Sequence, residues 1–401
     1  MKFRSRDGKN IFSDQYKTPL SERKRLLIGI LLFLLFLFAI IFRQPDRGGG
    51  ADTSSDTEIT VYKTGYCFDT VITLTAYTSQ GESGRAAQIL EDALLLCQEY
   101  EATYLDRFDE ESEVGAINAA QRQESDAGAS GAEEDEASDD RVDDANGNTG
   151  NAGHSYELSE VCRDLVEIGL YYYHVSDGAF DLTITPLSDL WNVTDEDFTV
   201  PAAEQVAEAK ALVGSDSVTL SGNVLTIGAG QQLNFGGIAK GYMCETLRQY
   251  FIEKGLLHVI VNLGGNVFVM GGGDGYTVAV ANPLSGDYAA TVVLSDGYVV
   301  TSGIYERGQE ADGVWYHHII NPSTGYPADT EIVSATVVMD TAVDQDSDVA
   351  WHSDALSTMF VLAKTQKGAD VLWQRLKEKE DYDVLSQVIL VMEDGTVVTF
   401  Q

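Results

Sequence analysis

The chain has 401 residues, which is enough to bury a large core in one domain or in two smaller ones. Its 26 basic and 63 acidic residues give a formal net charge of −37, so its surface repels nucleic acid and we expect no nucleic-acid partner. An anionic ligand must then be held by a metal ion, by helix N-termini and by backbone amides, because basic side chains are scarce.

The N-terminal segment predicts a membrane anchor. Residues 1–25 form a polar tail that ends in Arg23-Lys24-Arg25, and residues 26–42 form an unbroken apolar run that is just long enough for one transmembrane helix. Basic residues before the run place the tail in the cytoplasm and the rest of the chain outside it. We therefore expect a single-pass anchor in the cell membrane, a linker at 43–57 and one folded domain at 58–401. Cleavage of the run as a signal peptide is the alternative.

The first folded elements are strands followed by a helix. Residues 59–62 and 69–77 alternate like strands, apolar residues recur at helical spacing over 86–104, and a polar turn follows at 105–113. Residues 121–153 are rich in Gly, Ala, Ser, Asn and acidic residues. Such a composition buries too little apolar surface to become ordered, so we predict a disordered acidic insertion at 121–153.

The middle of the chain contains a glycine-rich turn. Helical periodicity covers 155–173 and 202–213, alternation covers 179–186, and a hairpin is expected at 218–227. The turn is Asn234-Phe235-Gly236-Gly237-Ile238-Ala239-Lys240-Gly241-Tyr242, and a helix is expected to follow it as far as Lys254. Glycines let the backbone approach a ligand, and a helix N-terminus offers free N–H groups to phosphate.

The second half of the chain consists mainly of strands. We expect strands at 258–263, 267–270, 276–282, 291–295, 298–300 and 333–339, helices at 353–363 and 367–377, and a closing hairpin at 387–400. This mixture of strands and helices predicts an α+β fold. Residues 315–327 are dense in polar, aromatic and turn residues beside strands, which is typical of a binding loop.

The predicted helix at 353–363 carries polar side chains within an apolar segment. Asp354 and Thr358 are four residues apart, so a helix places them on one face, and Ser357 flanks that face. Carboxylate and hydroxyl oxygens suit Mg²⁺ better than zinc or copper. The helix therefore indicates half of a magnesium site for a phosphate-bearing ligand. The alternative is that Asp354 caps the start of its own helix.

Taken together, these stretches resemble the ApbE family of FAD:protein FMN transferases. The resemblance runs from about Tyr66 to the C-terminus and is interrupted by the acidic insertion. Each motif is weak alone, but the ordered set is highly specific. The motifs are Phe68-Asp69-Thr70, residues 112–118, residues 179–191 beginning Ala179-Phe180-Asp181, residues 236–242, Thr301-Ser302-Gly303, His318-Ile319-Ile320-Asn321-Pro322 with Thr324-Gly325, and residues 354–358.

The resemblance implies a mixed α/β, T-fold-like catalytic domain that binds FAD with Mg²⁺. Such an enzyme moves the FMN half of FAD onto a Thr or Ser hydroxyl of an acceptor protein and releases AMP; here the acceptor would carry an FMN-binding domain outside the cytoplasm. The matching positions imply metal ligands at Gly237, Asp354, Ser357 and Thr358. They imply FAD contacts at Phe68, Phe108, Ala179, Phe180, Asp181, Asn234, Lys240 and Ile320. The sequence departs from the family pattern at Phe68, where methionine is common, and at Asn234 and Asn321, where aspartate is usual.

The acceptor hydroxyl needs a base. We expect His318 to serve, because the ordinary pKa of imidazole lies near working pH. Asp181 is a competing candidate, and a packed, purely structural His318 is the alternative. Two other functions remain open from the residues alone. One is a membrane-anchored flavin-binding module, and the other is an FAD pyrophosphatase that gives FMN and AMP with water as nucleophile.

Overall fold

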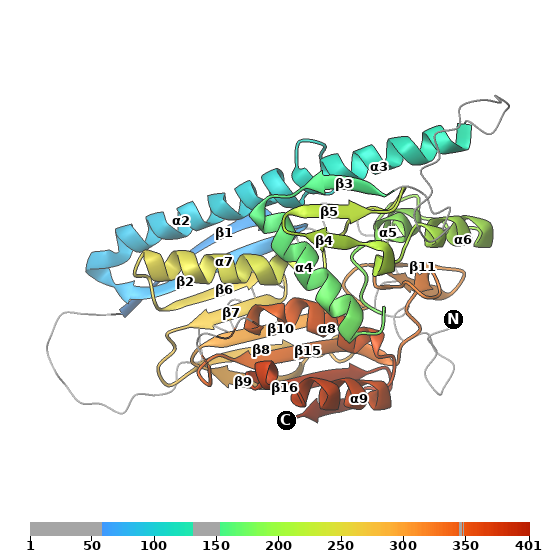
Figure 1. Ribbon diagram of the computed structural model, residues 1–401. Coiled ribbons are helices and arrows are strands. Elements are labelled where there is room, and N and C mark those ends of the chain that lie inside the picture. The colour runs from blue at the N-terminus through green and yellow to red at the C-terminus, as the bar shows by residue number, and fades with distance from the viewer. Residues whose placement is uncertain (1–57, 131–152, 345–346, 348) are drawn as a thin grey trace, which may run out of the picture.

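The computed structural model describes residues 58–130, 153–344, 347 and 349–401. Its centre is an eight-stranded sheet in the order β1-β2-β6-β7-β10-β15-β16-β17, with every neighbouring pair antiparallel (Figure 1). The strands span Glu58–Cys67 (β1), Thr70–Ser79 (β2), Val259–Leu263 (β6), Asn266–Met270 (β7), Gly297–Gly303 (β10), Ile332–Asp340 (β15), Leu385–Met392 (β16) and Val397–Phe400 (β17).

Helices pack on one face of this sheet, and a hairpin covers part of the other. The helices are α2 (Ser83–Tyr100), α7 (Ala239–Glu253), α8 (Ser353–Leu362) and α9 (Gln366–Lys377), and the hairpin consists of β8 (Tyr276–Ala281) and β9 (Tyr288–Leu294). Val337 belongs to the same buried apolar cluster as α8, whereas Val338 packs with the hairpin. Successive side chains of a strand point to opposite faces of the sheet. Because both faces are covered at β15, its side chains are buried along nearly the whole strand.

Smaller elements lie beside the helices at one end of the sheet (Figure 1). They are α3 (Glu113–Ser130), α4 (Glu160–Val175), α5 (Thr185–Trp191), α6 (Ala203–Ala211) and a small sheet of β3 (His154–Glu157), β5 (Val224–Ile227) and β4 (Thr219–Ser221). Two further hairpins pair β11 (Gly308–Ala311) with β12 (Val314–His317), and β13 (Ile320–Asn321) with β14 (Tyr326–Pro327). Short helical turns occur at Gln80–Glu82, Glu101–Leu105, Ser215–Ser217, Ala350–His352 and Glu380–Tyr382.

The predicted mixture of helices and strands is confirmed, and two boundaries in the middle of the chain are corrected. The helix predicted from 155 begins only at Glu160, because His154–Glu157 pair with β5 and the Ser159 hydroxyl caps α4 by accepting from Cys162 N–H. The strand predicted over 179–186 is absent from the described residues, where α5 begins instead. Pro186 lies in the first turn of α5, where its missing N–H costs nothing.

The predicted disordered insertion at 121–153 begins too early. Helix α3 continues to Ser130, and Gln121 is fully buried. The Gln121 side chain accepts from Gly230 N–H at 2.7 Å and donates to Tyr156 Oη at 3.1 Å. Composition alone did not reveal these two bonds, which hold the helix against β3 and the loop at Gly230. Residues 131–152 lie outside the described part of the chain.

The predicted tail, membrane anchor and linker at 1–57 also lie outside the described residues. Within the ranges that the structure describes, no helix is long and apolar enough to cross a membrane. The four cysteines, Cys67, Cys97, Cys162 and Cys244, are buried free thiols.

Replacement of Gln121 tests whether this part of the predicted insertion is structural. We expect Gln121→Ala to lower the free energy of unfolding by about 1–3 kcal/mol, because it removes the acceptor of the buried Gly230 N–H. Denaturant unfolding measures the change. The matched control is Gln88→Ala on α2, whose side chain is exposed and bonds to the exposed Asp92 one turn away, so its cost should stay below about 0.5 kcal/mol. Equal effects of the two substitutions would contradict a structural role for Gln121.

Candidate active site

The first turn of α8 presents a buried carboxylate to the start of α7. Asp354 is 2% exposed, and its Oδ1 and Oδ2 lie 3.3 and 3.4 Å from Lys240 Nζ. Gly241 N–H donates to Asp354 Oδ2 at 3.3 Å. A Cβ at Gly241 would lie 2.3 Å from the Trp351 carbonyl oxygen, so only glycine allows the two helices to approach this closely. Among the described residues no side chain caps α8, so the interpretation of Asp354 as the cap of its own helix is wrong.

Three hydroxyl groups lie next to this carboxylate on the same side of α8. Ser302, from β10, places its Oγ 2.7 Å from Ser357 Oγ and 3.0 Å from Thr358 Oγ1. A Cβ at Gly237 would lie 3.9 Å from Thr358 Oγ1, so the glycine turn borders the same group. The structure therefore brings together Asp354, Ser357, Thr358 and Gly237, which the sequence proposes as metal ligands.

The donor set of this site fits a hard divalent cation. Its atoms are carboxylate, hydroxyl and backbone oxygens, which match the ligand preference of Mg²⁺. Asp354 supplies the one carboxylate, and its contacts with Lys240 and Gly241 are all 3.3 Å or longer. No group of three or more His, Cys, Asp or Glu side chains is arranged to hold a metal anywhere in the described residues, and this site would rely on hydroxyl and backbone oxygens beside its one carboxylate.

Two cations and one titrating carboxyl surround the site. Lys240 Nζ also donates to the Gly236 carbonyl at 3.3 Å, and Arg307 donates to the Asp69 carbonyl at 3.3 Å. Glu306 is exposed to solvent, yet the protein around its carboxyl removes part of its hydration and raises its pKa to about 7. The positive charges of Lys240 and Arg307 oppose that rise, and the negative charge of Asp354 adds to it.

His318 lies half-buried in the same region. Its Nδ1 is 3.2 Å from the Arg307 carbonyl oxygen, which can only accept, so Nδ1 carries the hydrogen and Nε2 has the free lone pair. Loss of hydration lowers the pKa of His318 to about 4, and the cations Arg307 and Lys240 act in the same direction. The imidazole is therefore neutral at physiological pH and able to accept a proton at Nε2.

Asp181, the competing candidate base, is held by hydrogen bonds. Its Oδ1 accepts from Thr183 N–H at 2.8 Å, Thr183 Oγ1 at 2.7 Å and Ser215 Oγ at 2.6 Å, and its Oδ2 accepts from Ser215 N–H at 3.1 Å. These bonds tie the segment after Phe180 to the turn at Ser215–Ser217. The arrangement favours a structural role for Asp181 over proton transfer.

The predicted flavin contacts fall into two groups. Phe180 is 7% exposed and borders the glycine turn, since a Cβ at Gly237 would lie 2.9 Å from its ring. Asn234 shapes that turn by accepting from Gly236 N–H at 2.8 Å. Ala179 precedes Phe180, and Ile320 is buried in the cluster around Trp191.

Phe68 and Phe108 stand apart from this group. Phe68 has a φ of 54°, a left-handed conformation that costs energy for a side chain of this size, and its N–H donates to Glu101 Oε1 at 2.6 Å. Phe108 is 64% exposed beneath the Arg107 guanidinium, whose carbon is 3.9 Å from the ring centre. Phe68 packs at the edge of the apolar core that also contains Phe180, and within the described residues no ring or ion contact joins Phe108 to the Asp354 group.

Three residues near the centre of the site were not assigned a role there from the sequence. Ser302 bridges Ser357 and Thr358, and Glu306 and Arg307 supply charge beside His318 and Lys240. Ser302 lies within the motif Thr301-Ser302-Gly303, and Glu306 and Arg307 follow it, so that motif was the available signal. The motif gave no indication that β10 lies beside α8 in the folded protein.

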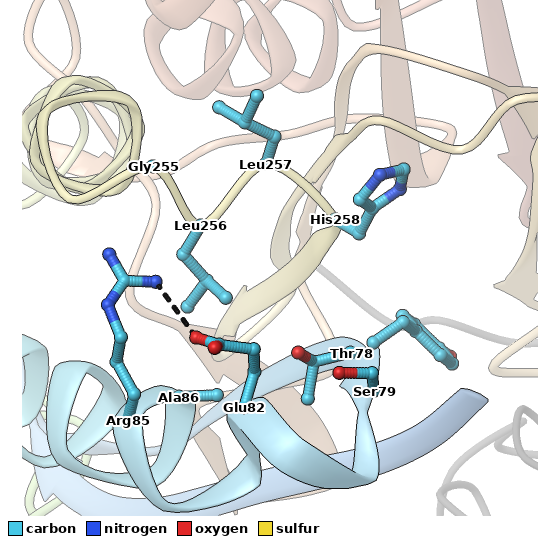
Figure 2. Close-up of a pocket in the computed structure, with 10 residues that line it drawn as sticks. Thr78, Ser79, Glu82, Arg85, Ala86, Gly255, Leu256, Leu257 and His258 are labelled. Atoms are coloured by element: carbon cyan, nitrogen blue, oxygen red, sulfur yellow. Dashed lines mark ion pairs between the residues drawn. The ribbon is translucent and has the colours of Figure 1, made fainter. Parts of the chain in front are cut away.

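A separate cavity lies away from these residues. It has a volume of about 360 Å³ and is bounded by the end of β2, the start of α2 and residues 255–258 (Figure 2). Figure 2 shows Arg85 and Glu82 paired at its edge, with 3.7 Å between their charged atoms. None of the residues that line it belongs to the predicted site, so it is not the candidate active site.

The fold and the site define a mixed α/β protein suited to holding a divalent cation and an anionic ligand. A family model described as the ApbE family matches residues 68–382, and the chain belongs to that family. A relative from Klebsiella pneumoniae, named FAD:protein FMN transferase, is 32% identical over 237 residues, which cover 58% of this chain and 70% of the relative. A relative of the same name from Treponema pallidum is 33% identical over 205 residues, covering 46% of this chain and 56% of the relative.

Solved structures of the family have the same fold. The crystal structure of the ApbE protein from Thermotoga maritima matches with a TM-score of 0.65 at 26% identity, covering 85% of this chain and 96% of that one. The apo flavinyl transferase ApbE from Pseudomonas stutzeri matches with a TM-score of 0.64 at 22% identity, covering 87% and 96%.

The raised pKa of Glu306 predicts a pH dependence. Below about pH 7 the carboxyl is neutral, and above it the carboxylate adds a negative charge beside Lys240. We expect the affinity for FAD, whose pyrophosphate diester does not titrate near neutrality, to fall about fivefold as pH rises through this pKa, equivalent to about 1 kcal/mol of Coulomb repulsion. Glu306→Gln should abolish the fall, as measured by quenching of flavin fluorescence. The same slope in both proteins would contradict the assignment.

Proposed function

We propose that this chain transfers the FMN half of FAD to a Thr or Ser hydroxyl of an acceptor protein and releases AMP, with Mg²⁺ as the required cation. The observation that carries the proposal is the convergence of Asp354, Ser357 and Thr358 with Lys240 at the Gly237 turn. The chain's membership of the ApbE family, and the transferase names of its relatives, support the same reaction.

The transfer replaces one bond to phosphorus by another. The acceptor oxygen bonds to the phosphorus of the FMN half, the bond from that phosphorus to the bridging oxygen breaks, and AMP leaves with that oxygen. The acceptor proton goes to Nε2 of His318, the nitrogen left free by the contact between Nδ1 and the Arg307 carbonyl. A pKa near 4 keeps the His318 ring neutral and able to accept at neutral pH, but it also makes the ring a weaker base than the imidazole titrating near neutrality that the sequence led us to expect.

The charge on the pyrophosphate must be neutralised for this reaction. Asp354, Ser357, Thr358 and the Gly237 carbonyl would hold Mg²⁺, which supplies counter-charge to the pyrophosphate when bound. Lys240 adds a side-chain cation in the first turn of α7, at the positive end of the helix dipole. Phe180, bordering the glycine turn, provides an apolar surface for the flavin.

Transfer and hydrolysis of FAD share this metal site and differ in the nucleophile. Incubation with FAD, Mg²⁺ and a candidate acceptor distinguishes them, since transfer adds FMN mass to the acceptor and hydrolysis leaves free FMN. Flavin binding without either product indicates the binding module. A storage protein has no need of the paired metal ligands, which is why transfer is the function proposed here.

We also propose that residues 26–42 anchor the chain in the cell membrane with the catalytic domain outside the cytoplasm. The support is the apolar run itself and the basic residues before it. The acceptor would then be exposed on the same side of the membrane.

One prediction of this proposal concerns Asp354. Asp354→Asn keeps the shape of the side chain and removes its charge, so Mg²⁺ loses its one carboxylate ligand. We expect the rate of FMN transfer to fall about 100- to 1,000-fold, the usual cost of losing one electrostatic stabiliser. Mass spectrometry of the acceptor over a Mg²⁺ titration measures the rate, and thermal melts monitor folding.

The matched control is Asp177→Asn, which removes a surface carboxylate that lies 2.9 Å from Arg375 Nη1. Asp177 has a φ of 53°, a conformation that asparagine also tolerates, so this variant should fold and transfer FMN normally. A near-normal rate with an unchanged Mg²⁺ dependence in Asp354→Asn would end the metal-site proposal.

Another prediction of this proposal concerns the orientation of the chain in the membrane. Protease added to intact spheroplasts should remove the catalytic domain, because it lies outside the cytoplasm. Full protection, with cleavage only after lysis, would overturn the orientation. A chain that begins after residue 43 without added protease would show that the N-terminal run is a cleaved signal peptide.

A further inference from the structure

A buried hydrogen-bonded chain lies behind the candidate site and has no part in the reaction described above. Lys379 Nζ and Tyr382 Oη each donate to Tyr171 Oη at 3.3 Å. Tyr172 Oη lies 3.0 Å from Tyr382 Oη and 3.0 Å from His352 Nδ1. Tyr172 and Tyr382 are completely buried. The chain therefore leads from a surface lysine to the residue two positions before Asp354.

The direction of these bonds fixes where the hydrogens lie. A phenol hydroxyl has one hydrogen to donate. Because Tyr382 donates to Tyr171, Tyr172 must be the donor to Tyr382. Tyr172 Oη then accepts from His352, so the hydrogen of that imidazole is on Nδ1.

Tyr172 also touches the flavin side of the site. Its ring meets Phe180 edge-on, with 6.3 Å between centroids and an angle of 67°, and it meets His352 with 5.5 Å and 84°. Phe180 in turn borders the Gly237 turn. A single side chain of α4 thus contacts both the aromatic residue assigned to the flavin and the start of the helix that carries Asp354.

The first turn of α8 depends on such contacts. Within the described chain no side-chain cap holds it, so its orientation rests on the residues just before it. Trp351 packs edge-on against Tyr242 of α7, with 5.4 Å between centroids, and His352 bonds to Tyr172 of α4. The contacts of Trp351 and His352, the two residues just before α8, therefore hold the carboxylate of Asp354 between α7 and α4.

We propose that Tyr172 is a positioning residue of the transferase site. Its hydroxyl holds His352, and it thereby fixes the position of the first turn of α8 relative to Phe180. The inference rests on the function proposed above. A tyrosine that served only to fill the core would be replaced by phenylalanine without effect on the metal, whereas a positioning residue would not.

The experiment compares wild-type protein with Tyr172→Phe, which keeps the ring and removes the hydroxyl. We expect the Mg²⁺ concentration for half-maximal transfer to rise about tenfold, the lower end of what loss of an outer partner costs a metal site. The KM for FAD at saturating Mg²⁺ should change little. Independently of activity, ¹⁵N spectra of labelled histidine should show His352 protonated at Nδ1 in the wild-type protein and shifted toward Nε2 in the variant.

Tyr382→Phe is the matched control, because it makes the same change in the same buried cluster but leaves the bond between Tyr172 and His352 in place. It should keep the wild-type Mg²⁺ dependence even if it lowers the melting temperature. If Tyr172→Phe fails to fold, His352→Phe breaks the same bond from the other side while keeping a ring, and it should show the same rise in Mg²⁺ requirement.

Two results would overturn the inference: an unchanged Mg²⁺ dependence in folded Tyr172→Phe, or an equal rise in Tyr382→Phe. Failure of the proposed function gives a different pattern, in which wild-type protein modifies no acceptor. In that event calorimetric titration of Mg²⁺ into the FAD-loaded proteins, with the His352 spectra, decides on Tyr172 alone. Equal Mg²⁺ affinities of wild type and Tyr172→Phe would then refute it.

Discussion

The close approach of α7 and α8 at Gly241 is the constraint on which the site depends. Asp354 is buried, and a buried carboxylate is costly unless charged or hydrogen-bonding partners surround it. Its partners, Lys240 and Gly241 N–H, both come from the other helix, and they reach it only because position 241 lacks a side chain. The same contact brings the glycine turn at 237 to the hydroxyl of Thr358, so one helix crossing aligns the groups that face the ligand.

The protein as a whole is negatively charged, whereas its candidate site gathers positively charged side chains. The chain as a whole is strongly acidic, yet its site gathers Lys240 and Arg307 around a neutral His318 and a carboxyl, Glu306, that is half protonated near neutrality. An anion is therefore attracted by a local arrangement rather than by the overall field. A change in the ionisation of a group beside Lys240, such as Glu306, therefore changes the affinity of the site for an anion.

Much of the site could be predicted from the sequence because helical spacing and local motifs are short-range properties. The i, i+4 relation of Asp354 and Thr358, and the glycine turn before α7, needed no knowledge of the fold. Ser302 and Glu306 were missed because their roles depend on β10 lying beside α8, a contact between segments some fifty residues apart. Asp181 was judged by residue type, and only the structure shows its carboxylate engaged by Thr183 and Ser215.

The errors in the fold have the same origin. Composition suggested that the helix around Gln121 was part of a disordered insertion, because a buried amide that bonds to a distant loop looks like any other polar residue. Alternation over 179–186 suggested a strand, but Pro186 and the bonds of Asp181 favour a turn and a helix start. Long, apolar strands such as β15 were placed correctly, since burial on both faces leaves a clear pattern.

The buried thiols have a consequence for where such a domain can work. Burial raises the pKa of Cys67, Cys97, Cys162 and Cys244, so the reactive thiolate form is scarce and the sulfur atoms are shielded from oxidants. The folded domain neither depends on a disulfide nor readily forms one. The stability of the folded domain is thereby insensitive to the redox potential around it, so the thiols themselves set no limit on the compartment in which the folded domain can work.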